Sequence, residues 1–177
     1  MASPEIQLRN GRAGDVTRMV QLLTDDRVRH HLGGPRPKSI ALPLAVVSVA
    51  GARCGRRRWA QIVSDARSGR MLGTVVADRR NPDRPGHVRP EGRELELSYV
   101  LLPDAWGRGI AEAACRELLA RVASEVRGDE PVLVVTQTSN QKALALAARL
   151  GFVACGEFVE FGSAQQLLTA SLTTFDA

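Results

Sequence analysis

The stretch that decides the fold runs from Glu94 to Ala113 and reads ELELSYVLLPDAWGRGIAEA. Its opening residues alternate between apolar and polar side chains, which is the period of a β-strand with two different faces. The apolar members are Leu95, Leu97 and Tyr99, and the polar members are Glu94, Glu96 and Ser98. The pattern predicts a strand over Glu94 to Leu102 that presents a row of polar side chains on one face.

A glycine-containing loop and a helix follow this strand. Gly107 and Gly109 precede Ile110, and from there apolar residues recur every four positions, which predicts a helix of about four turns that ends near Gly128. The first amides of a helix and its dipole can hold a pyrophosphate, and glycine leaves the approach open. A strand, a glycine loop and a helix therefore predict a phosphate site, although a plain turn before a helix has the same glycines.

Two other phosphate-binding loops do not fit this stretch. A dinucleotide-binding loop needs a third glycine where Glu112 stands, together with a following βαβ unit that carries a ribose-binding acid. A Walker loop needs Gly-Lys followed by Ser or Thr, which is absent. Neither class of nucleotide-binding protein is expected.

The segments on either side predict a mixed α/β (α+β) fold of a single domain, residues 1–177. Strands are expected at Glu5 to Arg9, Trp59 to Ser64, Met71 to Asp78, Val132 to Val135, Phe152 to Val159 and Leu167 to Phe175. Helices are expected from Gly14 to Leu23, Asp25 to Leu32, Pro43 to Cys54 and Asn140 to Leu150. The proline-rich, charged stretch from Arg79 to Arg93 is expected to be an exposed loop.

Composition excludes several functions. The 177 residues carry a formal charge of +5, but the arginines, including Arg56 to Arg58, lack the interleaved aromatics that single-strand binding uses, so nucleic acid is not an expected partner. Cys54, Cys115 and Cys155 form no metal or disulfide pattern, and no metal site is expected.

The longest apolar run, Ile40 to Ala52, is shorter than the ~20 residues of a bilayer span. With no secretion signal in the sequence, a cytoplasmic protein without membrane contact is expected.

Residues 96–113 resemble the acetyl-CoA signature of the GNAT superfamily of N-acetyltransferases. The family pattern is Gln or Arg, two residues, Gly, one residue, then Gly or Ala; Gly109 and Ala111 fit, while Trp106 replaces the first position. A tryptophan there resembles the ribosomal-protein-alanine N-acetyltransferase branch. A second motif, an asparagine that opens a helix ending in Leu-Gly-Phe, resembles Asn140 through Phe152. The first 58 residues match only loosely.

The resemblance implies a GNAT-like, mostly antiparallel sheet of about 6–7 strands, flanked by helices and opened by a V-shaped slot for acetyl-CoA as co-substrate. By resemblance, the strand before the glycine loop and the residues around it bind the cofactor. These are Leu101, Leu102, Trp106, Gly107, Arg108, Gly109, Ile110, Ala111, Glu112, Asn140 and Lys142. Asn140 could equally serve only as a helix N-cap.

The resemblance also implies direct attack of an acceptor amine on the thioester, without a covalent enzyme intermediate. Glu96, or else Glu94, could accept the amine proton if its carboxylate faces the slot, and a surface ion pair is the alternative. The tyrosine that often protonates the departing thiolate is replaced by Ala147, with Ser98 or water as substitute. Tyr99 and Cys115 are expected in the core, and His30 and His31 receive no role.

The acceptor stays open at this stage. A protein N-terminal amine or a small-molecule primary amine fits the same cofactor machinery. A non-catalytic acyl-CoA-binding or sensing domain is the alternative function, because the usual tyrosine is missing. A homodimer could form through exposed last strands.

Overall fold

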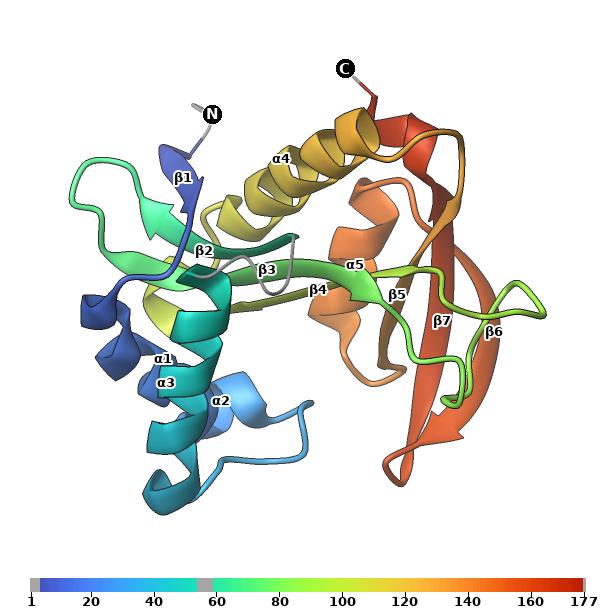
Figure 1. Cartoon of the computed structure of the whole chain (residues 1–177). Coiled ribbons are helices and arrows are strands. Elements are labelled where there is room, and N and C mark those ends of the chain that lie inside the picture. The colour runs from blue at the N-terminus through green and yellow to red at the C-terminus, as the bar shows by residue number, and fades with distance from the viewer. Residues whose placement is uncertain (1–3, 54–58, 177) are drawn as a thin grey trace.

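The computed structural model of the chain describes residues 4–53 and 59–176 (Figure 1). Within these ranges one sheet of seven strands has the order β1-β2-β3-β4-β5-β7-β6. All neighbouring strands are antiparallel except β4 and β5, which are parallel. The mixed, mostly antiparallel sheet flanked by helices confirms the fold class expected from the sequence.

The first half of the sheet contains β1 (Ile6–Arg9), β2 (Trp59–Asp65), β3 (Met71–Arg79) and β4 (Leu95–Leu101). The second and third of these strands form the predicted hairpin, and its turn uses Gly69 at φ +68°. The fourth strand then pairs with the third over seven positions, from Leu101 opposite Gly73 to Leu95 opposite Arg79.

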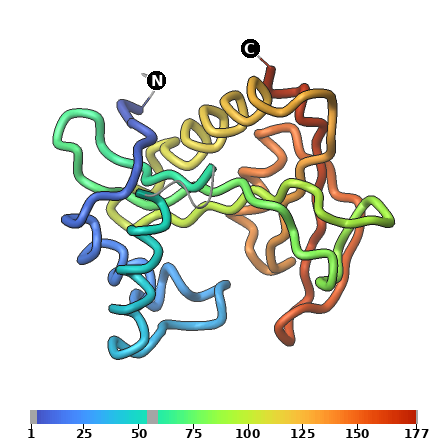
Figure 2. The backbone as a smooth tube through the Cα atoms, in the orientation of Figure 1, coloured from blue at the N-terminus to red at the C-terminus, as the bar shows by residue number. Residues whose placement is uncertain are grey.

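The second half contains β5 (Pro131–Gln137), β6 (Val153–Glu160) and β7 (Ser163–Ser171). The β7 strand lies in the middle of this half and pairs along its length with the other two. The connection from β3 to β4 crosses toward the β6–β7 hairpin, as the trace in Figure 2 shows, and Arg84 binds Glu160 there.

The helices cover both faces of the sheet. On one face, α4 (Ile110–Glu125) and α5 (Gln141–Arg149) pack into the larger core with η3 (Leu172–Phe175). On the other face lie α1 (Val16–Thr24), α2 (Asp26–Arg29) and α3 (Lys38–Arg53), which bury a smaller cluster against β2 and β3 (Figure 1). Two short turns, η1 (Ala13–Asp15) and η2 (Pro103–Ala105), precede α1 and the glycine loop. Among the described residues, no helix has the length and apolar character needed to cross a bilayer.

Three predicted boundaries are wrong, and the first is the end of the second helix, at Arg29 rather than Leu32. The third helix begins at Lys38 rather than Pro43, because the carbonyl of Pro37 starts its hydrogen bonds and Pro43 is accommodated inside it. Its predicted end at Cys54, like Arg56 to Arg58, falls outside the described residues. The last strand is Ser163–Ser171 rather than Leu167 to Phe175, because the polar residues before Leu167 pair with both neighbours and the chain turns into η3 after Ser171.

The loop from Arg79 to Arg93 is also less exposed than predicted. Arg80 is only 2% exposed, and Glu94 at the loop's end is 1% exposed. The Glu94 carboxylate accepts hydrogen bonds from His87 Nδ1 at 2.6 Å and from the amides of Val88 and Arg89 at 2.8 Å. Burial alone would raise the Glu94 pKa, but these donors outweigh it and lower the pKa from 4.5 to about 2. The loop is therefore anchored at the entrance to β4.

Glu94 should make stability depend on pH in acid. Because its pKa is lowered on folding, ionised Glu94 stabilises the fold above pH 4.5, and this contribution is lost as pH falls toward 2. A shift of this size corresponds to about 3 kcal/mol in the free energy of unfolding. Urea unfolding of Glu94→Gln should show lower stability at pH 7 and a flatter loss between these pH values. Glu91→Gln, an exposed carboxylate of the same loop, is the control, and equal pH profiles for wild type and Glu94→Gln would contradict the assignment.

Candidate functional site

The sheet opens where β4 and β5 part. These parallel strands pair at two positions only, Leu95 with Val132 and Glu96 with Leu133. Beyond them β4 stays paired with β3, and β5 stays paired with β7. We call this region the β4–β5 fork, residues 97–101 and 134–137. Backbone groups on the facing edges of the fork have no strand partner and can bond a ligand.

The glycine loop lies at the end of β4, beside the fork. Gly107 and Gly109 have φ of +70° and +72°, and a Cβ atom at either position would meet nothing within 4 Å beyond its chain neighbours. The first backbone hydrogen bond of α4 runs from Ala113 to the Gly109 carbonyl, so the amides of residues 110–112 lie in the unsatisfied first turn. Open space beside free amides at a helix N-terminus fits a pyrophosphate.

Trp106 contacts both the end of β4 and helix α5. Its Nε1 donates to the carbonyl of Leu101 at 2.9 Å, and the Lys142 ammonium lies 5.5 Å from the centre of its ring. The cation on α5 thus stacks against the indole that precedes the two glycines. Three of the residues chosen by resemblance therefore meet in space.

Asn140 is the N-cap of α5. Its Oδ1 accepts from the amide of Ala143 at 3.2 Å, and its Nδ2 donates to Thr136 Oγ1 at 3.2 Å. This accounts for the capping role considered from the sequence and fixes the start of α5 to the end of β5.

The other predicted cofactor residues differ in what they expose. Leu101 and Leu102 bury their side chains, one in each core cluster, so only their backbone could contact a ligand. Glu112 directs its carboxylate to Arg149 at 3.0 Å, a bond that lowers the Glu112 pKa. Arg108 is exposed, and its side chain makes a long contact of 3.5 Å with the carbonyl of Asp104.

Glu96 lies in a buried ion cluster. Arg80, whose side chain is fully buried, donates to Glu96 Oε2 at 2.7 Å, and two of its nitrogens donate to the carbonyl of Pro85. Arg84 binds both oxygens of Glu160 at 2.8 Å, which lowers the Glu160 pKa, and lies 3.8 Å from Glu96. Both arginines approach Oε2 of the Glu96 carboxylate, so its other oxygen, Oε1, lies outside this cluster. Ser98 follows on the same face of β4 and is exposed.

The opposite face of β4 is apolar. Tyr99 packs against the larger core, and burial raises its pKa. Burial likewise raises the pKa of the nearby Cys115 thiol to about 12. Ala147 is 2% exposed in the same core. These contacts agree with the core role expected for Tyr99 and Cys115.

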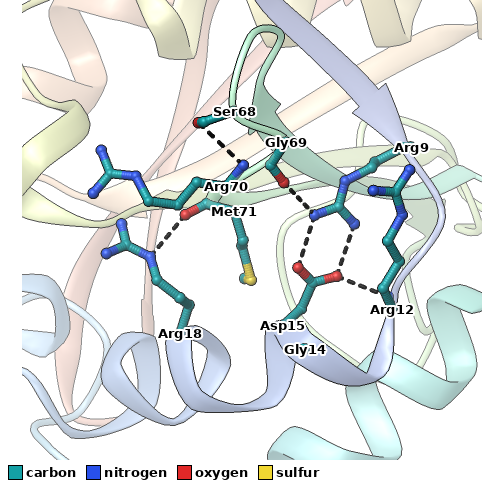
Figure 3. Close-up of a pocket in the computed structure, with 9 residues that line it drawn as sticks. All are labelled: Arg9, Arg12, Gly14, Asp15, Arg18, Ser68, Gly69, Arg70 and Met71. Atoms are coloured by element: carbon teal, nitrogen blue, oxygen red, sulfur yellow. Dashed lines mark hydrogen bonds and ion pairs between the residues drawn. The ribbon is translucent and has the colours of Figure 1, made fainter.

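A basic pocket of about 250 Å³ lies beside the β2–β3 turn (Figure 3). In its wall Arg9 makes two bonds of 2.7 Å to Asp15 and one to the carbonyl of Gly69, while its buried Nε has no partner among the described residues. Arg18 and Arg70 both bind Asp104 of η2 at 2.8 Å. The pocket's arginines therefore tie α1 and the hairpin to the turn that leads into the glycine loop.

Sequence reasoning missed two contacts near the fork. The amide of Arg80 donates to the carbonyl of Glu94. This contact follows from the pairing of β3 with β4, which the spacing of residues in the sequence did not reveal. His31, which received no role, lies 3.0 Å from Gln137 Oε1 at the end of β5. No local pattern joins residues this far apart in the chain.

The comparisons with known proteins agree with this geometry. A family model described as the acetyltransferase (GNAT) domain matches residues 5–153. The chain belongs to the GNAT acetyltransferase family. Acetyl-CoA, the acetyl donor expected from the sequence, is accordingly the co-substrate.

Solved structures share the fold at low sequence identity. A GNAT-family acetyltransferase from Bacillus anthracis has a TM-score of 0.76 at 12% identity, covering 97% of this chain and 98% of its own. Spermidine N-acetyltransferase from Vibrio cholerae, in complex with CoA and spermine, has 0.72 at 16%, covering 97% and 98%. A ribosomal alpha-N-protein acetyltransferase in complex with CoA has 0.70 at 15%, covering 96% of both chains. Among curated proteins, none matches this sequence significantly.

A side chain at Gly109 should block acetyl-CoA. Gly109→Leu would project into the open space beside the first-turn amides, so we expect the Kd for acetyl-CoA, measured by calorimetry, to rise tenfold or more, about 1.4 kcal/mol. Gly128→Leu is the matched control, because Gly128 also has a positive φ of +82° and open space around it, but lies beyond the far end of α4. An unchanged Kd in folded Gly109→Leu would remove the loop from the binding site.

Proposed function

We propose that this GNAT acetyltransferase transfers the acetyl group of acetyl-CoA to a primary amine by direct attack of the amine on the thioester. The observation that carries the proposal is the β4–β5 fork with the glycine loop at its end. Unpaired strand edges suit the pantetheine arm, and the first-turn amides suit the pyrophosphate. In support of this, the unpaired edge of β4 leads directly toward the loop that precedes these amides.

Within this proposal the loop residues hold the phosphates through backbone amides of residues 107–112 and through the Arg108 guanidinium. Trp106 and Lys142 shape the loop from either side of the fork, and Asn140 keeps α5 in place. The side chains of Leu101 and Leu102 are packed, so only backbone could reach the cofactor. The Leu102 amide and carbonyl already bond Leu72 and Ala105, so Leu101 is the better candidate of the two. The protein thus supplies orientation, which can account for a large part of a rate enhancement.

We assign to Glu96 the role of accepting the proton that the acceptor amine loses. Its Oε2 is engaged by Arg80, which holds the carboxylate still, and its Oε1 can accept a proton directly or through water. Glu94 is a poorer candidate, because both of its oxygens accept hydrogen bonds from His87, Val88 and Arg89. Ala147 replaces the tyrosine that often protonates the departing CoA thiolate, so Ser98 or water protonates it here. A thiol with a pKa near 8.5 needs little help to leave.

The acceptor class rests on resemblance. The neighbours include enzymes named for spermidine and for a ribosomal protein N-terminus, and Trp106 resembles the ribosomal-protein branch. An α-amine with a pKa near 8 costs only about 1 to 1.5 kcal/mol to deprotonate at pH 7, against about 4 for an alkylamine near 10.4. We therefore favour a protein N-terminal amine over a polyamine. A cytoplasmic location and action of residues 1–177 as one domain belong to the same proposal.

Loss of Arg108 should weaken phosphate recognition selectively. A charge-assisted hydrogen bond is worth about 1.5 to 3 kcal/mol, so Arg108→Ala should raise the KM for acetyl-CoA roughly tenfold to a hundredfold while leaving acetyl-pantetheine turnover unchanged. Arg121→Ala, an exposed arginine farther along α4 that pairs with Glu117, is the control. Equal losses with both donors would show that Arg108 does not act on the phosphates.

Loss of the Glu96 carboxylate should slow turnover rather than binding. Glu96→Gln is expected to lower kcat about 100- to 10,000-fold on a strongly basic amine, with nearly unchanged acetyl-CoA affinity and less effect on a weakly basic amine. Release of CoA thiol over time provides the measurement.

The control for this variant is Glu160→Gln, which removes the other carboxylate of the same ion cluster. Equal activity losses in the two variants would mean that the cluster is merely structural. Absence of thiol release by wild type with every amine class, despite tight acetyl-CoA binding, would favour the non-catalytic binding domain.

A further inference from the structure

A contact between two side chains crosses the open end of the β4–β5 fork. His31, in the loop that joins α2 to α3, places its Nδ1 3.0 Å from Oε1 of Gln137, the last residue of β5. The two backbone pairs between β4 and β5 lie at the other end of the fork. The halves of the sheet are therefore joined by backbone at the closed end and by a side-chain bridge at the open end.

His31 is tied to the half of the sheet that contains β4. Val28, three residues earlier in α2, is buried in the smaller core cluster together with Leu102, the residue that follows β4. Figure 1 shows α2 on the same side of the sheet as α1 and α3. The imidazole thus reaches Gln137 from a helix that is packed against the end of β4.

The loop that carries this imidazole is itself held in place. The Arg29 guanidinium donates to the carbonyls of Leu32 and Gly34, which closes the loop on itself. The amide of Arg36 then donates at 2.8 Å to the carbonyl of Leu23, in the last turn of α1. Because the loop is bonded both to itself and to α1, its position relative to β4 is fixed.

Gln137 is held equally well on the other side of the fork. Its backbone pairs with Gln165 of β7, and its carbonyl accepts from the amide of Asn140, the N-cap of α5, at 2.9 Å. The Ser139 hydroxyl lies 3.5 Å from both Gln137 Oε1 and His31 Nδ1. The bridge therefore sets the separation of two parts of the fold that are each firmly bonded.

We propose that His31 is a positioning residue for acetyl-CoA, because its bond to Gln137 holds the end of β5 at the distance from β4 that the pantetheine arm needs. This inference rests on the proposed function, which places that arm in the fork. Residues 134–137 pair with β7 and have no partner on the β4 side among the described strands, so no backbone ladder sets this distance. A slot that is already held open lowers the cost of binding.

The second contact across the open end is less exacting. It joins Trp106 to Lys142, with the ammonium 5.5 Å from the centre of the ring. A cation–π contact tolerates a range of positions over the ring, whereas a hydrogen bond requires a narrow range of distance and angle. The width of the fork is therefore controlled more closely by the His31 bridge.

Two other roles for His31 do not fit its place. Gln137 lies four residues beyond Leu133, the partner of Glu96, and four strand residues span about 13 Å. The imidazole is thus too far from Glu96 to share in its proton transfer. In the described part of the chain, no group of three His, Cys, Asp or Glu side chains could hold a metal ion. Positioning requires neither role, because Nδ1 donates in the imidazolium and in one neutral tautomer.

Acetyl-CoA affinity and turnover separate this role from a purely structural one. His31→Phe keeps a ring but removes the donor, so we expect the Kd by calorimetry and the KM for acetyl-CoA to rise about threefold to tenfold. The kcat at saturating acetyl-CoA should change by less than about twofold, because the bridge acts on binding. His31→Asn, whose amide nitrogen can replace Nδ1 as donor, should restore the affinity to within about twofold of wild type.

His30→Phe is the matched control. His30 is the exposed neighbour, its ring lies edge-on to that of His31 at 4.6 Å, and phenylalanine preserves this ring contact. The same substitution at this position should leave the Kd and the KM unchanged.

A double-mutant cycle tests the bridge itself. Gln137→Leu should raise the Kd as His31→Phe does, and the double variant should bind no more weakly than either single variant. Additive losses, or an unchanged Kd in folded His31→Phe, would overturn the proposal. If His31→Phe does not fold, Gln137→Leu decides: a raised Kd supports the proposal, and an unchanged Kd overturns it. A wild type that binds no acetyl-CoA would overturn the proposed function, and this inference with it.

Discussion

The fold depends on the short parallel contact between β4 and β5. Each strand has a complete antiparallel partner on its outer side, and the two meet at only two positions before they part. The contact joins the two halves of the sheet, and its early end leaves facing backbone edges that have no strand partner among the described residues. A longer pairing would hold the sheet together more firmly but would leave no space for a ligand arm.

Two sets of ion pairs hold the elements around this fork. On one side Asp104 receives Arg18 and Arg70, which fixes the turn before the glycine loop. On the other side fully buried Arg80 binds Glu96 at 2.7 Å. Removing one partner of a buried ion pair lowers the free energy of unfolding by about 3 to 5 kcal/mol. This second set therefore contributes more to the site than an exposed ion pair would. Glu96, the proposed base, is thus positioned by an arginine that is itself held.

Local patterns in the sequence predicted the fold class, the β2–β3 hairpin, β4, and the two helices after it. They predicted these elements because polar–apolar alternation, apolar residues at every fourth position and glycines at the ends of elements are signals within a short stretch of chain. The same signals gave no pairing partners, so they missed the burial of Arg80 and the contact of His31 with Gln137. The polar start of β7 was missed because its pairing, not its composition, makes it a strand. For the candidate site, resemblance selected residues that do gather around the fork, while their roles remain proposals.

We propose that acetyl-CoA lies along β4 and ends at the glycine loop. Hydrogen–deuterium exchange of the backbone amides, with and without acetyl-CoA, tests this binding path directly. We expect slower exchange confined to residues 98–102 and 107–112, with the hairpin turn at residues 66–70 unaffected. Protection of that turn and the basic pocket beside it, with unchanged exchange in the glycine loop, would show that acetyl-CoA binds elsewhere.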